Sequence, residues 1–251
     1  MQPARIDNVT YNDHPQLQNF LFIAGLHRSG TTLLERLMTA NFDVSYLRAN
    51  VPESEGQHMQ TVYSPAYKFG GPGRFAFNPG MEQELLELDD YGTCRATLLS
   101  DWQPFVVGTA KTLLEKSPPN LTKIWWLRAV FPGCRFLIMT RDPRATTAAT
   151  QKWTNTSLAE LMMHWNAAYS KAMEDYRDSD CAIVRYEDLT NNANEELERI
   201  ANFCNIRTCS KKPDQLEERH RTIHNSNGAY IAAHGGNNYG VGIWEQFGCK
   251  M

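Results

Sequence analysis

Residues 20–40, with the sequence FLFIAGLHRSGTTLLERLMTA, decide the fold of this chain. The apolar run at residues 20–24 is typical of a buried strand, and Gly25 ends it. After the loop at residues 26–30, leucine and methionine side chains recur on one stripe of a helix that we expect to begin at Thr31. A strand, a glycine loop and a helix N-terminus in this order form a cradle for an anion, because free N–H groups and the helix dipole face it.

The residues of the loop indicate which kind of anion it binds. Gly25 and Gly30 have the spacing of a P-loop, but a nucleotide triphosphatase would have Lys and then Ser or Thr after the second glycine. The cation here is Arg28, whose guanidinium can hold a phosphate or sulfate with two hydrogen bonds. An ordinary strand-to-helix turn with polar caps is the plainer alternative. The other loop residues that we expect to contact the anion are His27, Ser29, Gly30, Thr31 and Thr32.

The composition is that of an ordinary globular α/β chain, which we expect to form one domain over residues 1–251. A net charge of −3 argues against a nucleic-acid surface, and no apolar run approaches the length of a membrane span. Six scattered cysteines and a polar start predict a reduced, cytoplasmic location. The spacing of Cys204, Cys209, His220 and His224 approaches that of a zinc finger, but the middle gap is short, and we predict no metal site.

Strands and helices are predicted to alternate along the chain. Such alternation predicts a central parallel sheet with helices on both faces. Residues 69–80 hold six glycines and prolines among aromatic residues, which is typical of a surface loop or lid. Further strands are predicted at 112–117, 135–140 and 181–186, and helices at 81–101, 121–130, 144–153, 157–177 and 193–204.

Cations follow three of the predicted strands. Arg28 comes after the first strand, Lys116 ends the second, and Arg141 follows the third. Because ligands of parallel sheets bind beyond the carboxyl ends of the strands, these cations favour a ligand with two separated phosphate groups. A local ion pair between Arg141 and Asp142 is the alternative. A magnesium-dependent kinase would have an acidic residue where Arg141 stands.

Several segments resemble, in order, the motifs of sulfotransferases that use 3'-phosphoadenosine 5'-phosphosulfate (PAPS). The resemblance is greatest to the bacterial, Golgi and tyrosylprotein types, and it covers residues 21 to 206. It implies the sulfotransferase fold, which is a P-loop-like central parallel sheet flanked by helices. The segments are GLHRSGTT at 25–32, LEKSP at 114–118, FPGCRF at 131–136, RDPR at 141–144 and VRYEDL at 184–189.

The resemblance also implies an activity. The protein would move a sulfuryl group from PAPS to a hydroxyl or amine of a small-molecule or carbohydrate acceptor and release adenosine 3',5'-bisphosphate (PAP), with no metal required. Arg141, Thr150 and Arg185 would contact the nucleotide. The family usually has Ser at the position of Ala149 to bind the 3'-phosphate, so Thr150 or Thr147 would supply that hydroxyl here.

Within this resemblance, four residues are candidates for catalysis. Arg28 and Lys116 would stabilise the charge that develops on the departing 5'-phosphate. Glu55 is the first candidate for the base that takes the acceptor's proton, His58 is the second, and Glu53 is the third. A solvated loop carboxylate is the alternative interpretation of Glu55.

Two other functions and several acceptors stay open. A P-loop nucleotide kinase or triphosphatase is one alternative, and a non-catalytic nucleotide- or carbohydrate-binding protein is the other. We expect neither nucleic acid nor membrane as a partner. A glycine-rich segment at residues 234–242 is a candidate flap over the site. The aromatic residues that would line either an acceptor pocket or the core are Tyr63, Tyr67, Phe69, Phe75 and Phe77.

Overall fold

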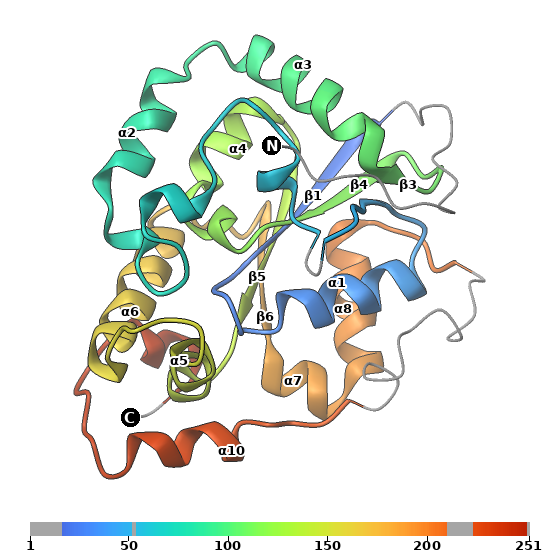
Figure 1. Ribbon diagram of the computed structural model, residues 1–251. Coiled ribbons are helices and arrows are strands. Elements are labelled where there is room, and N and C mark those ends of the chain that lie inside the picture. The colour runs from blue at the N-terminus through green and yellow to red at the C-terminus, as the bar shows by residue number, and fades with distance from the viewer. Residues whose placement is uncertain (1–16, 52–53, 210–222, 250–251) are drawn as a thin grey trace.

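The computed structural model describes residues 17–51, 54–209 and 223–249, and its centre is a six-stranded sheet (Figure 1). The strand order is β3-β2-β4-β1-β5-β6, and every neighbouring pair is parallel except β2 with β3. The predicted α/β fold with a mostly parallel sheet is therefore confirmed. The strands are β1 (Asn19–Ala24), β2 (Ser45–Leu47), β3 (Val106–Val107), β4 (Thr112–Lys116), β5 (Arg135–Thr140) and β6 (Cys181–Arg185).

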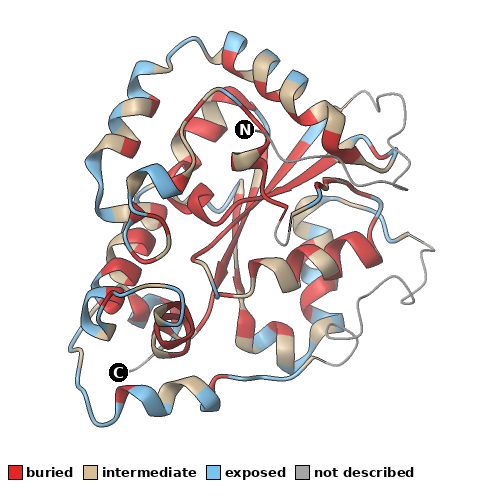
Figure 2. Cartoon of the chain, viewed as in Figure 1, coloured by how far each residue is buried: buried red, intermediate tan, exposed pale blue. Residues whose placement is uncertain are grey.

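The central strand β1 contributes to two separate cores, because successive side chains of a strand point to opposite faces. Phe20, Phe22 and Ala24 pack into the core on one face of the sheet. Leu21 and Ile23 pack into the core on the other face. Figure 2 shows the sheet buried along most of its length, with the exposed residues on the outer sides of the helices.

Helices cover both faces, as the alternation of elements predicts. Residues of α2, α3, α4 and α6 lie in the first core, and residues of α1, α7 and α8 lie in the second. The short α10 packs against α5 at the lower edge of Figure 1. The helices are α1 (Thr31–Asn41), α2 (Pro79–Glu87), α3 (Tyr91–Trp102), α4 (Ile124–Val130), α5 (Pro143–Gln151), α6 (Leu158–Glu174), α7 (Tyr186–Asn191), α8 (Ala193–Cys204) and α10 (Gly228–Ile231).

The expectation of one continuous helix over residues 81–101 is wrong. The structure has two helices there, and Asp90 begins the second by accepting a hydrogen bond from the main-chain N–H of Thr93. Aspartate competes for main-chain N–H groups in this way, so it favours a helix start over a helix interior. Residues 69–80 form short 3₁₀ turns and the start of α2.

Some predictions fall on residues that are not described. Glu53, the third candidate for the base, is one of them, and His220 of the zinc-finger spacing is another. Within the described ranges, no helix is long and apolar enough to cross a membrane.

The buried Trp165 of α6 provides a test of the packing. Its ring lies 4.1 Å from that of Tyr169 and 5.7 Å from that of Phe247, between centroids. We expect Trp165→Ala to lower the free energy of unfolding by about 3–5 kcal/mol, because the cavity closes only partly. Met163→Ala is the control on the same helix, since Met163 is exposed. Urea unfolding measures both, and equal losses for the two variants would contradict the assignment of Trp165 to the core.

Candidate active site

Two glycines make the loop between β1 and α1 compact. A Cβ atom on Gly25 would lie 2.6 Å from the carbonyl oxygen of Met139, so no larger residue fits there. Gly30 is the N-cap residue of α1 and has a φ of 108°, a left-handed conformation that favours glycine. Because glycine has no side chain, no capping group at this position competes for the first-turn N–H groups of α1, which suits the binding of an anion.

Arg28 is the exposed cation of this loop. Its φ of 68° is also left-handed, which is uncommon for a residue with a side chain. The guanidinium stacks on the ring of Trp153, with Cζ 4.8 Å from the ring centroid. Arg28 therefore lies on the outer side of the loop, where a phosphate or sulfate can reach it.

The predicted hydroxyl donors of the loop differ in orientation. Ser29 is fully buried, and its Oγ atom lies 2.9 Å from the place that a Cβ on Gly25 would take. Its hydroxyl therefore packs beneath the loop and does not face an outside ligand in this conformation. Thr31 is buried and Thr32 is partly exposed at the start of α1. A contact of these residues with a ligand stays a prediction.

Glu55 and Lys116 meet although they are 61 positions apart in the chain. Lys116 ends β4, and its Nζ atom lies 3.4 Å from Oε1 of Glu55. The other carboxylate oxygen accepts a hydrogen bond of 2.5 Å from the side-chain amide of Gln57. Both Glu55 and Lys116 are buried, so Glu55 is not the solvated loop carboxylate that the sequence left open.

The electrostatic surroundings keep Glu55 ionised. Burial by itself raises the pKa of this carboxyl, but the charge of Lys116 and the hydrogen bond from Gln57 oppose it, and the pKa lies below its ordinary value. Burial lowers the pKa of His27 to about 4, so this imidazole is neutral at neutral pH and adds no charge. Lys116 and Gln57 therefore keep Glu55 as a carboxylate, which is the form that can accept a proton.

His58 lies on the outer side of the same cluster. Its Nε2 atom is 3.7 Å from Oε2 of Glu55, and its ring stacks on that of Tyr67 with centroids 6.2 Å apart. Burial lowers the pKa of His58, with Glu55 acting in the opposite direction. The structure thus places the second base candidate beside the first.

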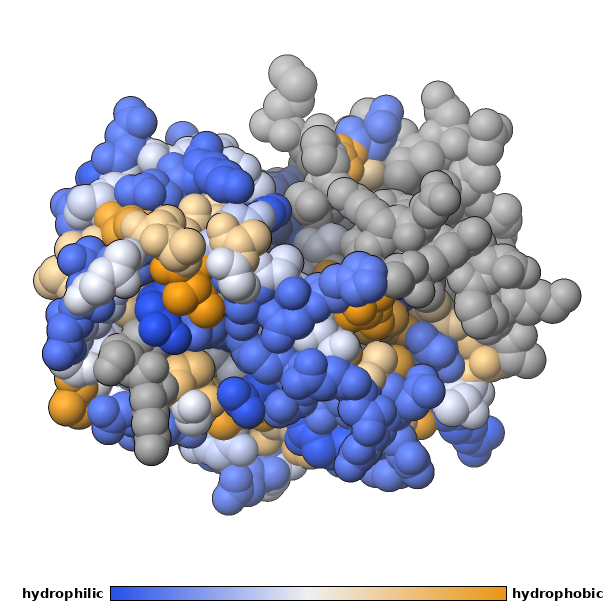
Figure 3. Space-filling view, turned by 90° about the horizontal axis from the view of Figure 1, so that it is seen from below, coloured by the Kyte–Doolittle hydropathy of each residue, from blue (hydrophilic) through white to orange (hydrophobic). Residues whose placement is uncertain are grey.

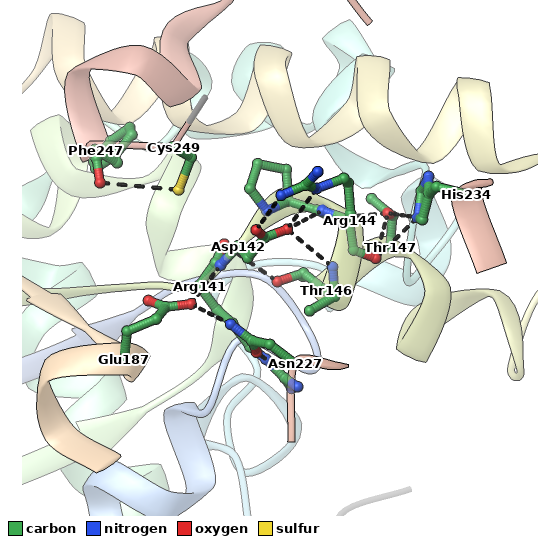
Figure 4. A network of polar contacts seen from close by, with 12 residues as sticks. Arg141, Asp142, Arg144, Thr146, Thr147, Glu187, Asn227, His234, Phe247 and Cys249 are labelled. Atoms are coloured by element: carbon green, nitrogen blue, oxygen red, sulfur yellow. Dashed lines mark hydrogen bonds and ion pairs between the residues drawn. The ribbon is translucent and has the colours of Figure 1, made fainter. Parts of the chain in front are cut away.

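Arg141 forms a second basic site next to the loop. It is buried, and its guanidinium donates to the carbonyl oxygen of Arg28 at 3.0 Å, to Oδ1 of Asn227 at 2.8 Å and to Oγ of Ser226 at 3.1 Å. Figure 4 shows the contact with Asn227 and the neighbouring bond from Asn227 to Glu187. The guanidinium also lies over the ring of Tyr186, 4.3 Å from the centroid.

The hydroxyls expected to replace the usual serine at Ala149 are directed to the main chain. Thr150 Oγ1 donates to the carbonyl oxygen of Thr146 at 2.8 Å, and Thr147 Oγ1 donates to that of Pro143 at 2.7 Å. Both residues are buried. The hydroxyl that reaches Arg141 is instead that of the exposed Ser226, which also lies 3.2 Å from Tyr186 Oη.

The sequence carried little signal for Ser226 and Asn227. Both stand in a polar stretch without helical or strand periodicity, and only the fold of the C-terminal segment brings them to Arg141.

Arg185, at the end of β6, has an ion pair of 3.4 Å with Asp188, and its guanidinium lies against Gly248. A direct contact of Arg185 or Thr150 with the nucleotide stays a prediction.

The aromatic residues proposed for an acceptor pocket divide between core and surface. Tyr63 and Phe75 are buried, whereas Tyr67 is 62% exposed. Phe69 and Phe77 line a cavity of about 470 Å³ together with Arg74 and Glu160. Figure 3 views the molecule from the edge where β5 and β6 end, and its described surface is mainly hydrophilic with small apolar groups.

The described residues hold no group of three or more His, Cys, Asp or Glu side chains arranged for a metal ion. The candidate site instead combines guanidinium, ammonium, hydroxyl and main-chain donors with the carboxylate of Glu55. These groups fit a ligand with phosphate or sulfate groups at two places, one at the loop and one at Arg141.

Comparison with known proteins identifies the family. Residues 21–209 match the sequence profile described as "Sulfotransferase family", which is most of the chain. The chain therefore belongs to the Sulfotransferase family, and it is a transferase.

Individual relatives agree with this assignment. The protein-tyrosine sulfotransferase of Drosophila melanogaster is 25% identical over 233 residues, which are 82% of this chain and 43% of that protein. Protein-tyrosine sulfotransferase 2 of Gallus gallus is 28% identical over 204 residues, 74% of this chain and 51% of that protein. This chain thus spans about half the length of the curated relatives that it matches.

The fold is shared with solved sulfotransferase structures. The sulfotransferase domain of the Synechococcus PCC 7002 olefin synthase has a TM-score of 0.58 and 16% identity, over 98% of this chain and 100% of that domain. At this identity the likeness concerns the fold alone, and it confirms the sulfotransferase fold that the sequence predicts.

The ionisation of Glu55 tests the electrostatics of the site. In Lys116→Met the burial of Glu55 remains while the nearby positive charge is lost, so we expect the pKa of Glu55 to rise above its ordinary value. Nuclear magnetic resonance of labelled glutamate carboxyls, titrated with pH, measures this. The control Lys111→Met removes an exposed lysine just before β4, at the other end of the strand from Lys116, and should leave the titration unchanged. An unaltered Glu55 titration in Lys116→Met would show that Lys116 does not set its charge.

Proposed function

We propose that the protein transfers a sulfuryl group from PAPS to a hydroxyl or amine of an acceptor and releases PAP. The observation that carries the proposal is the buried Glu55 carboxylate, 3.4 Å from the Lys116 ammonium. These two groups lie where β4 ends, and β4 pairs with β1, whose loop holds Arg28. A base, a cation for the leaving group and an anion loop are thus contributed by adjacent elements.

The residues of the chain have distinct parts in this reaction. PAPS supplies an activated sulfuryl group, whose S–O bond to the 5'-phosphate breaks as a bond to the acceptor atom forms. Glu55 takes the proton of the acceptor hydroxyl or amine. Arg28 and Lys116 stabilise the negative charge that develops on the 5'-phosphate oxygen. Arg141 and Ser226 hold the 3'-phosphate, and Ser226 supplies the hydroxyl that Ala149 lacks.

The acceptor is proposed at the level of its chemical class. The curated relatives are named for protein tyrosine, and a tyrosine hydroxyl belongs to the same class as a phenol or a sugar hydroxyl. Tyr67, stacked on His58 at the outer side of the Glu55 cluster, offers an aromatic surface beside the proposed base. A small-molecule or carbohydrate hydroxyl or amine remains our proposal, with tyrosine peptides as further candidates. A cytoplasmic location also stays a prediction.

The alternative of a nucleotide kinase is disfavoured by the position of Arg141. A magnesium-dependent enzyme places an acidic residue after the strand that neighbours the phosphate loop. Here the buried Arg141 follows β5, and the Lys of the P-loop is absent after Gly30. A non-catalytic binding protein would bind PAP but transfer no sulfuryl group to any acceptor, which the turnover assay below distinguishes.

Nucleotide binding is the first test. Calorimetry with PAP, without magnesium, should show binding by the natural protein. Arg28→Ala and Arg141→Ala should each weaken the binding about 10- to 150-fold, since a hydrogen bond to a charged group contributes about 1.5–3 kcal/mol. Arg177→Ala is the matched control, because Arg177 is exposed and precedes β6. It therefore lies where the strand begins, whereas the site lies where the strands end. No affinity of the natural protein for PAP would refute the proposed function.

Turnover tests the base. A panel of phenols, alcohols, amines, sugars and tyrosine peptides is assayed with sulfur-labelled PAPS. Glu55→Gln should reduce kcat about 10²- to 10⁴-fold, because the amide cannot accept the proton. His58→Ala should retain more than about a tenth of the activity, since Glu55 and Lys116 remain paired. If both variants keep near-natural turnover, the assignment of the base is wrong.

A further inference from the structure

Glu115 is a buried carboxylate one residue before Lys116, and the proposed reaction does not use it. Its exposed fraction is 2%. It accepts hydrogen bonds from the main-chain N–H of Gly56 at 2.9 Å, from Ser117 Oγ at 2.6 Å and from the side-chain amide of Asn120 at 2.6 Å. A buried charge with three donors is a costly arrangement, so its partners indicate what it is for.

The contact with Gly56 requires the absence of a side chain. A Cβ atom on Gly56 would lie 2.5 Å from Oε1 of Glu115. Glycine is therefore needed here for a close approach of the chain to the carboxylate. The residue before it is Glu55, so the carboxylate of Glu115 holds the peptide unit that follows the proposed base.

Ser117 extends this hold by one residue. Its hydroxyl donates to Glu115 and accepts a hydrogen bond of 3.1 Å from the main-chain N–H of Gln57. Two successive N–H groups, those of Gly56 and Gln57, are thus tied to the end of β4. The indole N–H of Trp102 donates to the carbonyl oxygen of Gly56 at 3.0 Å and holds the same segment from the other side.

The fixed segment controls the carboxylate of Glu55 through Gln57. The side-chain amide of Gln57 donates to Oε2 of Glu55 at 2.5 Å, and its carbonyl oxygen accepts from the main-chain N–H of Ala66 at 2.9 Å. Gln57 is buried. Its main chain and both ends of its side chain are therefore held, so its amide binds Oε2 of Glu55 while Oε1 faces Lys116.

Asn120 joins the same carboxylate to β1, the strand that precedes the anion loop. Its amide donates to Oε2 of Glu115 and also to the carbonyl oxygen of Ile23 at 3.2 Å, two residues before Gly25. Burial raises the pKa of Glu115, and the hydrogen bonds from Ser117 and Asn120 oppose that rise. The carboxylate is the acceptor in both of these bonds, which fits the ionised form.

We propose that Glu115 is a positioning residue that acts through Gly56 and Gln57 to hold Glu55 against Lys116. This inference rests on the proposed function, since it concerns how the proposed base is placed. It explains why a carboxylate precedes the lysine at the end of β4. It also predicts that Glu115 affects turnover and leaves nucleotide affinity unchanged.

Glu115→Gln tests the inference with a side chain of the same shape. The amide has one acceptor oxygen where the carboxylate has two, so either the Gly56 N–H and Ser117 or the side-chain amide of Asn120 loses its acceptor, and the cluster that holds Gly56 and Gln57 loosens. Glu196→Gln is the matched control, because Glu196 is also buried and hydrogen-bonded, to Arg199 on the remote helix α8. Turnover is measured as the release of PAP from PAPS in the presence of the best acceptor of the panel. If no acceptor is found, the hydrolysis of PAPS by water is measured in its place. The affinity for PAP is measured by calorimetry.

We expect kcat of Glu115→Gln to fall about 10- to 100-fold, because small displacements of catalytic groups cost this much, while the Kd for PAP stays within about two-fold. The acid limb of the kcat–pH profile should move to higher pH, since Glu55 keeps its burial but loses its contact with Lys116. Glu196→Gln should change none of these. A folded Glu115→Gln with natural kcat and an unmoved acid limb would overturn the inference, as would an equal effect of Glu196→Gln.

A double-mutant cycle completes the test. Gly56→Ala should lower kcat to a similar extent. Combining it with Glu115→Gln should add little, because both substitutions disturb the same contact, that between Gly56 and Glu115. Fully additive losses contradict the inference. If Glu115→Gln does not fold, Gly56→Ala and Ser117→Ala replace it: each should lower kcat and leave the Kd for PAP within about two-fold. A natural protein without PAP affinity or turnover refutes the proposed function itself, whereas an active natural protein with unaffected variants refutes only the role of Glu115.

Discussion

The contact between the buried Glu55 carboxylate and the Lys116 ammonium is the interaction on which the proposed chemistry depends. In a protein interior each of these charges alone is strongly unfavourable, and each makes the other possible. Their separation of 3.4 Å is longer than a tight ion pair. At this distance the charge of Lys116 still holds the pKa of Glu55 low.

The order of the strands makes this meeting possible. β1 lies between β4 and β5, so the loop after β1 has Lys116 on one side and Arg141 on the other. The hydrogen bond from Arg141 to the carbonyl oxygen of Arg28 shows how close the two basic sites are. Since parallel strands end at one edge of the sheet, the groups that follow them gather there without further adjustment of the chain.

The sequence predicted much of this arrangement because its signals are local. The apolar run of β1, its glycine loop and the stripe of α1 are each recognisable within a few residues, and the cations follow strands directly. The two-residue β3 and three-residue β2 escaped prediction, since such short strands show no periodicity. The break between α2 and α3 was missed because the apolar stripe continues through it, while Asp90 caps a new helix.

Other features depend on contacts between distant residues. Ser226 and Asn227 reach Arg141 from 85 and 86 positions away, and no local pattern indicates such a contact. The hydroxyls of Thr147 and Thr150 looked suitable for a ligand, but inside a helix such hydroxyls turn to main-chain carbonyls four residues earlier. Orientation of this kind depends on the finished helix and on its neighbours.

The alternation of strands and helices, the glycine loop between β1 and α1 and the chemical identity of the groups at the strand ends could be predicted from the chain alone, because these depend on side-chain type and spacing. Which groups face one another became visible only in the folded chain: Glu55 lies against Lys116, Ser29 is buried beneath its loop, and the Gly56 N–H donates to Glu115. The physical reason is that burial, charge compensation and close approach are properties of the packed chain, and they arise between residues tens of positions apart.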